Sequence, residues 1–161
     1  MHPPLVALFA AAAAAAAPEL PSSVQAAVKS VADQCREVGG TPKTDKALAS
    51  ADLNADGAPD FILDVGGAIC DGAWSVYGDR EKAVTVFLAD GKGGAAQAFE
   101  DWTFGSKLEG GKLWLTVAGE KCGKKPAANF ASENFCERPL AWTAKTKKLD
   151  YAPVSAAKMI E

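Results

Sequence analysis

The residues that could do chemistry are concentrated in one short stretch, residues 52–60, which reads Asp-Leu-Asn-Ala-Asp-Gly-Ala-Pro-Asp. The oxygen-bearing groups at positions 1, 3, 5, 7 and 9 belong to Asp52, Asn54, Asp56, Ala58 (through its backbone carbonyl) and Asp60. A hard cation such as Ca²⁺ takes six to eight oxygen ligands, and alternate residues of a curled loop direct their oxygens to one centre. Gly57 stands where such a loop turns too sharply for a side chain. The spacing therefore predicts a calcium-binding loop.

This loop is not of the EF-hand type, which needs a bidentate Glu at position 12 and a helix on each side. Position 12 is Leu63, and residues 61–65 predict a strand, because a short apolar run bounded by glycine fits a pleated sheet. The pattern D-x-N-x-D-G-x-P-D followed by a strand resembles the calcium loop of FG-GAP (integrin-like, VCBS-like) repeats. The resemblance implies a loop between two strands, with calcium held by the side chains of Asp52, Asn54, Asp56 and Asp60 and by the carbonyl of Ala58. The alternative is an Asx-rich hairpin turn without a metal, since Asp, Asn and Gly favour turns in any case.

The resemblance does not extend to a whole propeller. A propeller repeats four to eight blades of roughly 40–50 residues, and the sequence contains no second loop of this kind. Residues 90–94 read Asp-Gly-Lys-Gly-Gly without alternating carboxylates, so they predict a plain hairpin turn. The chain also resembles small secreted bacterial proteins that carry such a loop and paired cysteines, a resemblance that implies compartment and metal but no activity.

Residues 1–16 are expected to be a signal peptide. The apolar segment 5–17 is too short to span a bilayer and ends in alanines that offer A-x-A cleavage sites. The alternative is an alanine-rich helix of the mature protein. We therefore expect a single periplasmic or secreted domain at residues 17–161, with no transmembrane segment after cleavage.

The charge pattern gives little indication of a partner. A formal net charge of −3 is too mild to predict binding to nucleic acid or to a membrane. Acidic side chains predominate between residues 41 and 81, and basic ones between residues 121 and 150. The basic half could contact an anionic envelope polymer, although lysines in turns are usually just solvated.

One amphipathic helix is expected, at residues 22–38. Ser22 and Gln25 have the spacing of a capping box, and Gly39 can terminate the helix. The apolar residues that follow 3–4 spacing form one stripe, expected to face the core: Val24, Ala27, Val28, Val31, Cys35 and Val38.

The cysteines are expected to form two disulfides, because their number is even and the chain is expected to be exported. Among three possible pairings we favour Cys35–Cys70, which ties the helix to the sheet, and Cys122–Cys136, which closes a polar loop. Zinc is poorly supported, since no C-x-x-C pair occurs and the only histidine, His2, lies in the signal segment.

The remainder predicts antiparallel strands, because period-2 alternation is interrupted by Gly-rich and Lys-rich turns. They are expected at residues 83–89, 96–104, 112–118, 139–144 and 149–153. The tryptophans within them are assigned to the core: Trp102, Trp114 and Trp142. Trp74 and Tyr77 lie in an expected loop, 71–79, where exposed aromatics could bind a ligand or could equally pack over the sheet edge.

These expectations define an α+β fold: an N-terminal amphipathic helix packed on a mainly antiparallel sheet or meander, with a calcium-type loop in one hairpin. Without a mature histidine, no Ser-His or Cys-His pair is available for catalysis, so an enzyme is disfavoured. The leading hypothesis is an exported module with structural Ca²⁺. The alternative is an envelope interaction or inhibitor protein that acts through the 71–79 loop or through the lysines of the Cys122–Cys136 loop, Lys121, Lys124 and Lys125.

Overall fold

The computed structural model describes residues 19–160, so the expected signal peptide at 1–16 lies outside the described residues. The helix and strands in chain order are α1 (Ser22–Glu37), β1 (Thr41–Lys43), β2 (Leu48–Ala51), β3 (Asp60–Asp64), β4 (Ile69–Asp71), β5 (Lys82–Ala89), β6 (Ala95–Thr103), β7 (Gly105–Glu109), β8 (Lys112–Ala118), β9 (Phe135–Thr143), β10 (Lys148–Tyr151) and β11 (Lys158–Met159). Single 3₁₀ turns occur at Val65–Gly67, Gly119–Cys122, Phe130–Ser132 and Val154–Ala156.

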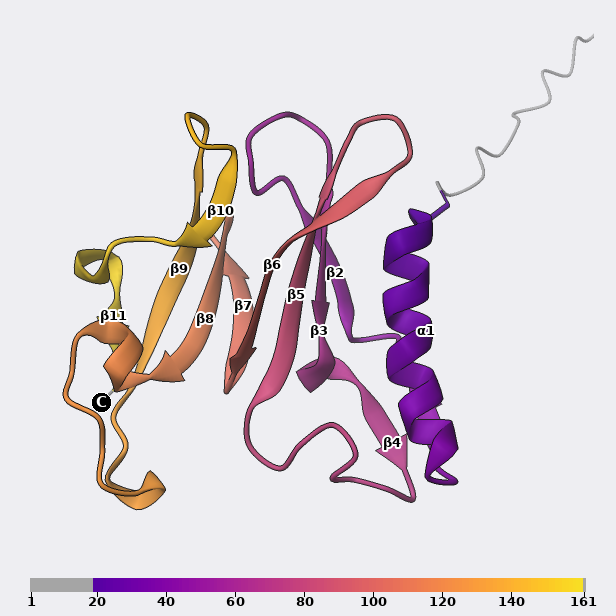
Figure 1. Cartoon of the computed structure of the whole chain (residues 1–161), viewed down its shortest axis with the longest axis horizontal. Coiled ribbons are helices and arrows are strands. Elements are labelled where there is room, and N and C mark those ends of the chain that lie inside the picture. Colours follow the sequence, from indigo (N-terminus) through magenta and orange to yellow (C-terminus); the bar gives the residue numbers. More distant parts are fainter. Residues whose placement is uncertain (1–18, 161) are drawn as a thin grey trace, which may run out of the picture.

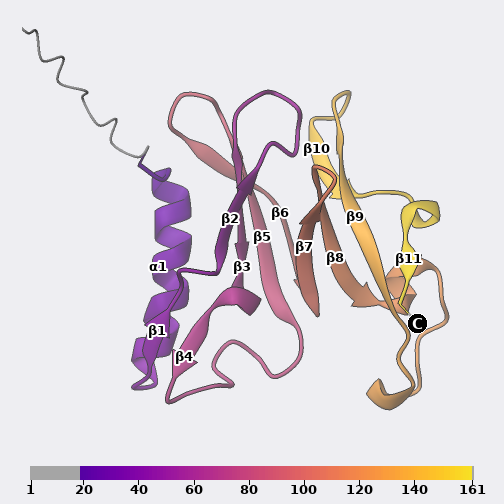
Figure 2. The same ribbon diagram turned by 180° about the vertical axis from the view of Figure 1, so that it is seen from behind.

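These elements form three layers, with α1, a central sheet and a second sheet lying side by side (Figure 1). The central sheet has the strand order β2-β3-β5-β6, and the second has the order β10-β9-β8-β7, with β11 paired to β9. Strands β1 and β4 form a separate ribbon beside α1, as the reverse view shows (Figure 2). Every strand pair is antiparallel.

The central sheet is buried on both faces. Alternate residues of a strand point to opposite faces, and Ile62 on β3 packs into the core between the two sheets. Its neighbour Leu63 packs into the core beneath α1. On β5, Val86 and Phe87 divide between the two cores in the same way. The helix and the second sheet are therefore both needed to cover apolar side chains of the same strands.

The expected strands are present with small shifts of their ends, but they do not form a single meander. The chain leaves the central sheet after β6 and enters the second sheet at β7. Phe104 sits at this transition, and its N–H donates to the carbonyl of Thr116 at 2.8 Å. The short strands β1, β4, β7 and β11 were not expected from the sequence, because none carries a long alternating pattern.

The helix matches the expectation except at its two ends. The expected capping box is wrong, because Pro21 is the N-cap residue and no side chain caps the turn. The Gln25 side-chain amide instead donates to the carbonyl of Leu20 at 2.6 Å. The helix ends at Glu37 and Gly39 follows with φ of 81°. Val38 is therefore outside the buried stripe and is 58% exposed.

The assignment of three tryptophans to the core is correct for only one of them. Trp142 packs against the core between the sheets. Trp102 is 53% exposed, because it lies on β6, an edge strand of the central sheet. Trp114 alternates with the buried Leu113 and Leu115, so it lies on the outer face of the second sheet, where the Lys158 ammonium is 4.1 Å from its ring centroid.

Both expected disulfides are confirmed. Cys35 bonds to Cys70, which joins α1 to β4, and Cys122 bonds to Cys136 across a sequence separation of 14. Gly40 lies against the first disulfide, and a Cβ at this position would clash with the Cys70 sulfur. Two disulfides indicate an oxidising, extracytoplasmic environment. In residues 19–160, no helix combines the length and the apolar composition that crossing a bilayer would require.

Removing either bridge should destabilise the domain, and the longer loop should cost more. The chain-entropy relation gives about 4 kcal/mol for a closed loop of 35 residues and about 3 kcal/mol for one of 14. We expect Cys35→Ser/Cys70→Ser to lower the free energy of unfolding more than Cys122→Ser/Cys136→Ser, as measured by urea titration. The reverse order would show that the disulfide contribution does not follow loop length here.

Candidate metal centre

The candidate loop connects β2 to β3 and protrudes from one end of the central sheet, at the top of Figure 1. The two strands pair in register up to Ala51 opposite Asp60, so the loop begins and ends at a closed hairpin. Two residues adopt left-handed backbone conformations, Gly57 with φ of 88° and Ala55 with φ of 59°. Glycine adopts such a φ freely, whereas alanine pays about 1–2 kcal/mol for it. The loop is therefore curled tightly enough to impose strain at Ala55.

The side-chain oxygens of the loop turn inward onto its own backbone. The two carboxylate oxygens of Asp52 accept the N–H groups of Asp56 and Gly57, at 3.2 and 2.9 Å. The amide oxygen of Asn54 accepts the same Asp56 N–H at 3.1 Å. Oxygens from positions 1 and 3 therefore lie beside one another. Asp56 accepts the Ala58 N–H at 2.8 Å, and its other oxygen accepts the Asn54 side-chain amide at 2.9 Å.

Asp60 differs from the other carboxylates because its side chain is fully buried. One oxygen accepts the N–H of Leu53 at 2.8 Å, and the other accepts the N–H of Ala89 at 2.9 Å. Burial raises the pKa of Asp60, the two backbone hydrogen bonds oppose that rise, and the negative charges of Asp56 and Asp52 add to it. Asp60 thus connects the base of the loop to the end of β5.

The donor set fits a hard cation in its chemistry, since it offers three carboxylates, an amide oxygen and a backbone carbonyl. The side chains themselves are arranged around N–H groups. Within residues 19–160, no three Asp, Glu, His or Cys side chains already converge as a metal-ligating group. Holding a cation would therefore require the oxygens of Asp52, Asp56 and Asp60, which all accept N–H groups here, to direct their remaining lone pairs to one centre.

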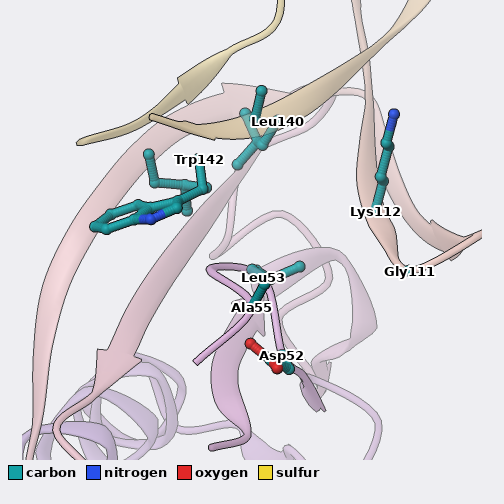
Figure 3. Close-up of a pocket in the computed structure, with 9 residues that line it drawn as sticks. Asp52, Leu53, Ala55, Gly111, Lys112, Leu140 and Trp142 are labelled. Atoms are coloured by element: carbon teal, nitrogen blue, oxygen red, sulfur yellow. The ribbon is translucent and has the colours of Figure 1, made fainter. Parts of the chain in front are cut away.

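A cavity of about 310 Å³ adjoins the loop at the open end between the two sheets (Figure 3). Asp52, Leu53 and Ala55 contribute one side of it. Leu140 and Trp142 from the second sheet line the opposite side, as the close-up shows. The loop therefore covers the edge of the core between the sheets.

The other expected binding residues do not form one surface. Trp74 is 75% exposed on its loop, whereas Tyr77 is only 6% exposed and donates to the carbonyl of Val31 at 2.9 Å. Of the two alternatives for Tyr77, the structure shows packing: its ring lies in the core beneath α1, and its hydroxyl is hydrogen-bonded to the helix backbone. Lys124 and Lys125 are exposed beyond the turn at Cys122.

Lys121 belongs to a half-buried network that the sequence did not indicate. Its ammonium pairs with Asp101, and the Tyr151 hydroxyl donates to the same carboxylate at 2.7 Å. Burial alone would raise the pKa of Asp101, but the hydrogen bonds from Lys121 and Tyr151 outweigh it, so the pKa is lowered. Burial and the Asp101 hydrogen bond raise the pKa of Tyr151. These three residues join the turn before Cys122 to both sheets, and no local spacing connects them in the sequence.

Comparison with known proteins adds no relative. No protein-family model, no curated protein and no solved structure gives a significant match to this chain. The functional argument therefore depends on the residues and geometry described above.

Asp60→Asn should destabilise the domain even in a calcium chelator. Asparagine has a single carbonyl oxygen, so the N–H of either Leu53 or Ala89 would face an amide group and lose its acceptor. An unsatisfied buried donor costs about 1–3 kcal/mol, which urea unfolding in EGTA would measure. Asp56→Asn, an exposed substitution in the same loop, is the control and should change stability little. Equal effects of the two variants would contradict the role of Asp60 as the acceptor that joins the Leu53 and Ala89 N–H groups.

Asp101→Asn should remove a pH-dependent part of the stability. Because the native pKa of Asp101 lies below its unfolded value near 3.8, the stabilisation is fully present above that pH and is lost as the pH falls through the native pKa. We expect the variant to be less stable than wild type by about 1–2 kcal/mol at pH 7. In urea titrations this difference should shrink at pH values below 3.8. A difference that stays constant into strong acid would contradict the ion pair as its cause.

Proposed function

We propose that this chain is a small exported calcium-binding module, periplasmic or secreted, in which Ca²⁺ is structural and pins the β2–β3 hairpin. The observation that carries the proposal is the spacing of the oxygen groups of Asp52, Asn54, Asp56, Ala58 and Asp60 along one tight turn that strand pairing closes. Calcium supplies a divalent positive charge that takes oxygen ligands. The chain supplies those oxygens from a loop whose ends are already closed by strand pairing.

Electrostatic repulsion within the loop supports a cation there. The charges of Asp56 and Asp52 disfavour ionisation of Asp60, after the larger effect of burial. A divalent cation among these carboxylates would offset the repulsion and favour the ionised forms. The side chains of Asp52, Asn54, Asp56 and Asp60, with the carbonyl of Ala58, are the ligands that we assign, as the resemblance to FG-GAP loops implies.

A structural role fits the position of the loop better than a catalytic one. The loop joins adjacent strands of the central sheet. At its end, the Asp60 carboxylate accepts a hydrogen bond from the N–H of Ala89, the last residue of β5. Ordering the loop would therefore stabilise the pairing of three strands. The two disulfides agree with an extracytoplasmic protein, where calcium is available at concentrations that low-affinity sites require.

Calcium should raise the melting temperature of the oxidised protein, and Asp56→Ala should abolish or greatly weaken that response. Binding to the native state alone stabilises by about 2.7 kcal/mol at a hundredfold excess over Kd. For a domain of this size that corresponds to a shift of several degrees. Thermal melts in EGTA and across a titration into the millimolar range would measure the response. Magnesium should not reproduce it.

Asp90→Ala is the matched control for this experiment. Asp90 accepts the N–H groups of Lys92 and Gly94 in the turn after β5, so its loss changes stability without touching the proposed ligands. This variant should melt lower than wild type in EGTA but keep the full calcium shift. An absence of any calcium shift in wild type, or an equal shift in Asp56→Ala, would contradict the proposal.

A further inference from the structure

A second hollow, of about 430 Å³, lies where β3 ends, β5 begins and β6 passes into β7. Its walls come from three segments that are distant in the sequence: 64–67, 80–82 and 104–106. Its volume falls in the range of pockets for small molecules. None of the residues expected to bind calcium or a partner lines it, so it is separate from the loop at residues 52–60.

Two cationic residues, Arg80 and Lys82, line this hollow, and the charged group of each contacts a neutral group next to the lining. The Arg80 guanidinium lies 3.9 Å from the centroid of the Phe130 ring, which favours a stacked guanidinium. The Lys82 ammonium donates to the carbonyl of Gly78. Neither side chain forms an ion pair within residues 19–160. Both side chains are therefore held beside the hollow by neutral groups, and neither charge is neutralised by a carboxylate in contact.

The single carboxylate of the hollow is already engaged. One oxygen of Asp64 accepts the Gly66 N–H at 2.7 Å, and the other accepts the hydroxyl of Ser106. Two cationic residues and one carboxylate leave the lining with one net positive charge. A ligand with a single negative charge matches this balance. A dianion would exceed it by one charge and would be repelled more strongly by Asp64.

The remaining lining favours a flat apolar body behind the anionic group. Phe104 contributes an aromatic residue, whose ring is held in place by packing edge-to-face against Phe135 at a centroid distance of 4.8 Å. The lining glycines Gly66, Gly67 and Gly105 have no side chains. A Cβ on Gly66 would come within 2.9 Å of an Asp64 oxygen and 3.6 Å of the Lys82 Cγ. Glycine therefore keeps open the space between the carboxylate and the lysine stem.

We propose that this hollow binds a small organic monocarboxylate with an aromatic or other flat apolar body. The carboxylate would take charge-assisted hydrogen bonds from Arg80, whose planar guanidinium matches it in bidentate geometry, and from Lys82. The apolar body would lie along Phe104 and the glycine backbone. The proposal does not depend on calcium, because no residue of the 52–60 loop contributes to the lining.

Sodium benzoate is the probe that tests this assignment, with benzamide as its uncharged counterpart. In ¹H–¹⁵N NMR titrations of the oxidised protein in EGTA, benzoate should produce saturable shifts at the amides of Gly66, Gly67 and Gly105. Saturation is expected in the millimolar range, which is ordinary for a ligand of this size. Benzamide should produce none, and phenyl phosphate as a dianion should bind more weakly than benzoate. Raising the salt concentration should weaken benzoate binding.

Arg80→Gln and Lys82→Gln should each raise the Kd for benzoate about tenfold or more, because each removes a charged donor. Lys145→Gln is the matched control, since Lys145 is exposed in the turn between β9 and β10, and it should leave the Kd unchanged. Arg80→Lys keeps the charge but loses the planar fork, so its Kd should lie between those of wild type and Arg80→Gln.

Three results would overturn the proposal: no saturable shift at these glycines, equal binding of benzamide, or the same Kd for Arg80→Gln and Lys145→Gln. Tighter binding of phenyl phosphate would overturn the assignment to a monocarboxylate. Because the titration is made in EGTA, a failed calcium response and a failed benzoate response remain distinguishable.

Discussion

The burial of the central sheet on both faces is the constraint on which the rest of the structure depends. Ile62 and Val86 contribute to the core between the sheets, and Leu63 and Phe87 to the core beneath α1. Burying a large apolar side chain stabilises a protein by about 1.5–3 kcal/mol relative to leaving it exposed to water. Loss of either outer layer would therefore expose apolar residues of β3 and β5. On this side α1, which is joined by a disulfide through Cys35, shares the cover with residues between β3 and β5, among them Cys70 and Tyr77.

Asp60 connects the loop at residues 52–60 to this buried sheet through hydrogen bonds. A fully buried carboxylate is costly unless hydrogen bonds satisfy it, and here two backbone N–H groups do so from opposite directions along the chain. One of them belongs to the loop and the other to β5. The conformation of residues 52–60 is therefore coupled to the sheet, and a loop that binds a cation would stabilise more than its own turn.

Local features of the fold could be predicted from sequence, and features that depend on layer order could not. The oxygen spacing at residues 52–60 and the 3–4 stripe of α1 can be recognised in the sequence. The cysteine pairing that we favoured among three possible ones is confirmed. The second face of the central sheet was also foreseeable, because residues 83–89 are apolar at nearly every position, which is typical of a strand covered on both sides. The alternation of residues 112–118 and the short turns predicted a meander, but these local features do not encode the division of the strands into two sheets.

Errors arose where the outcome depends on which strand lies at an edge. Trp102 has the alternation of a core residue, yet the face of β6 on which it lies is incompletely covered. The pocket at Arg80 could not be foreseen either, since it forms only because the chain changes sheets at Phe104 and brings Ser106 against Asp64. Nothing in the local spacing of these residues encodes that change.

Strand β3 has an aspartate at each end, and the two aspartates differ in role because they have different hydrogen-bond partners. Asp60 is buried and accepts only backbone N–H groups, so it stabilises the hairpin. Asp64 is half-buried, and through the Ser106 hydroxyl it joins the two sheets at the edge of a hollow that carries excess positive charge.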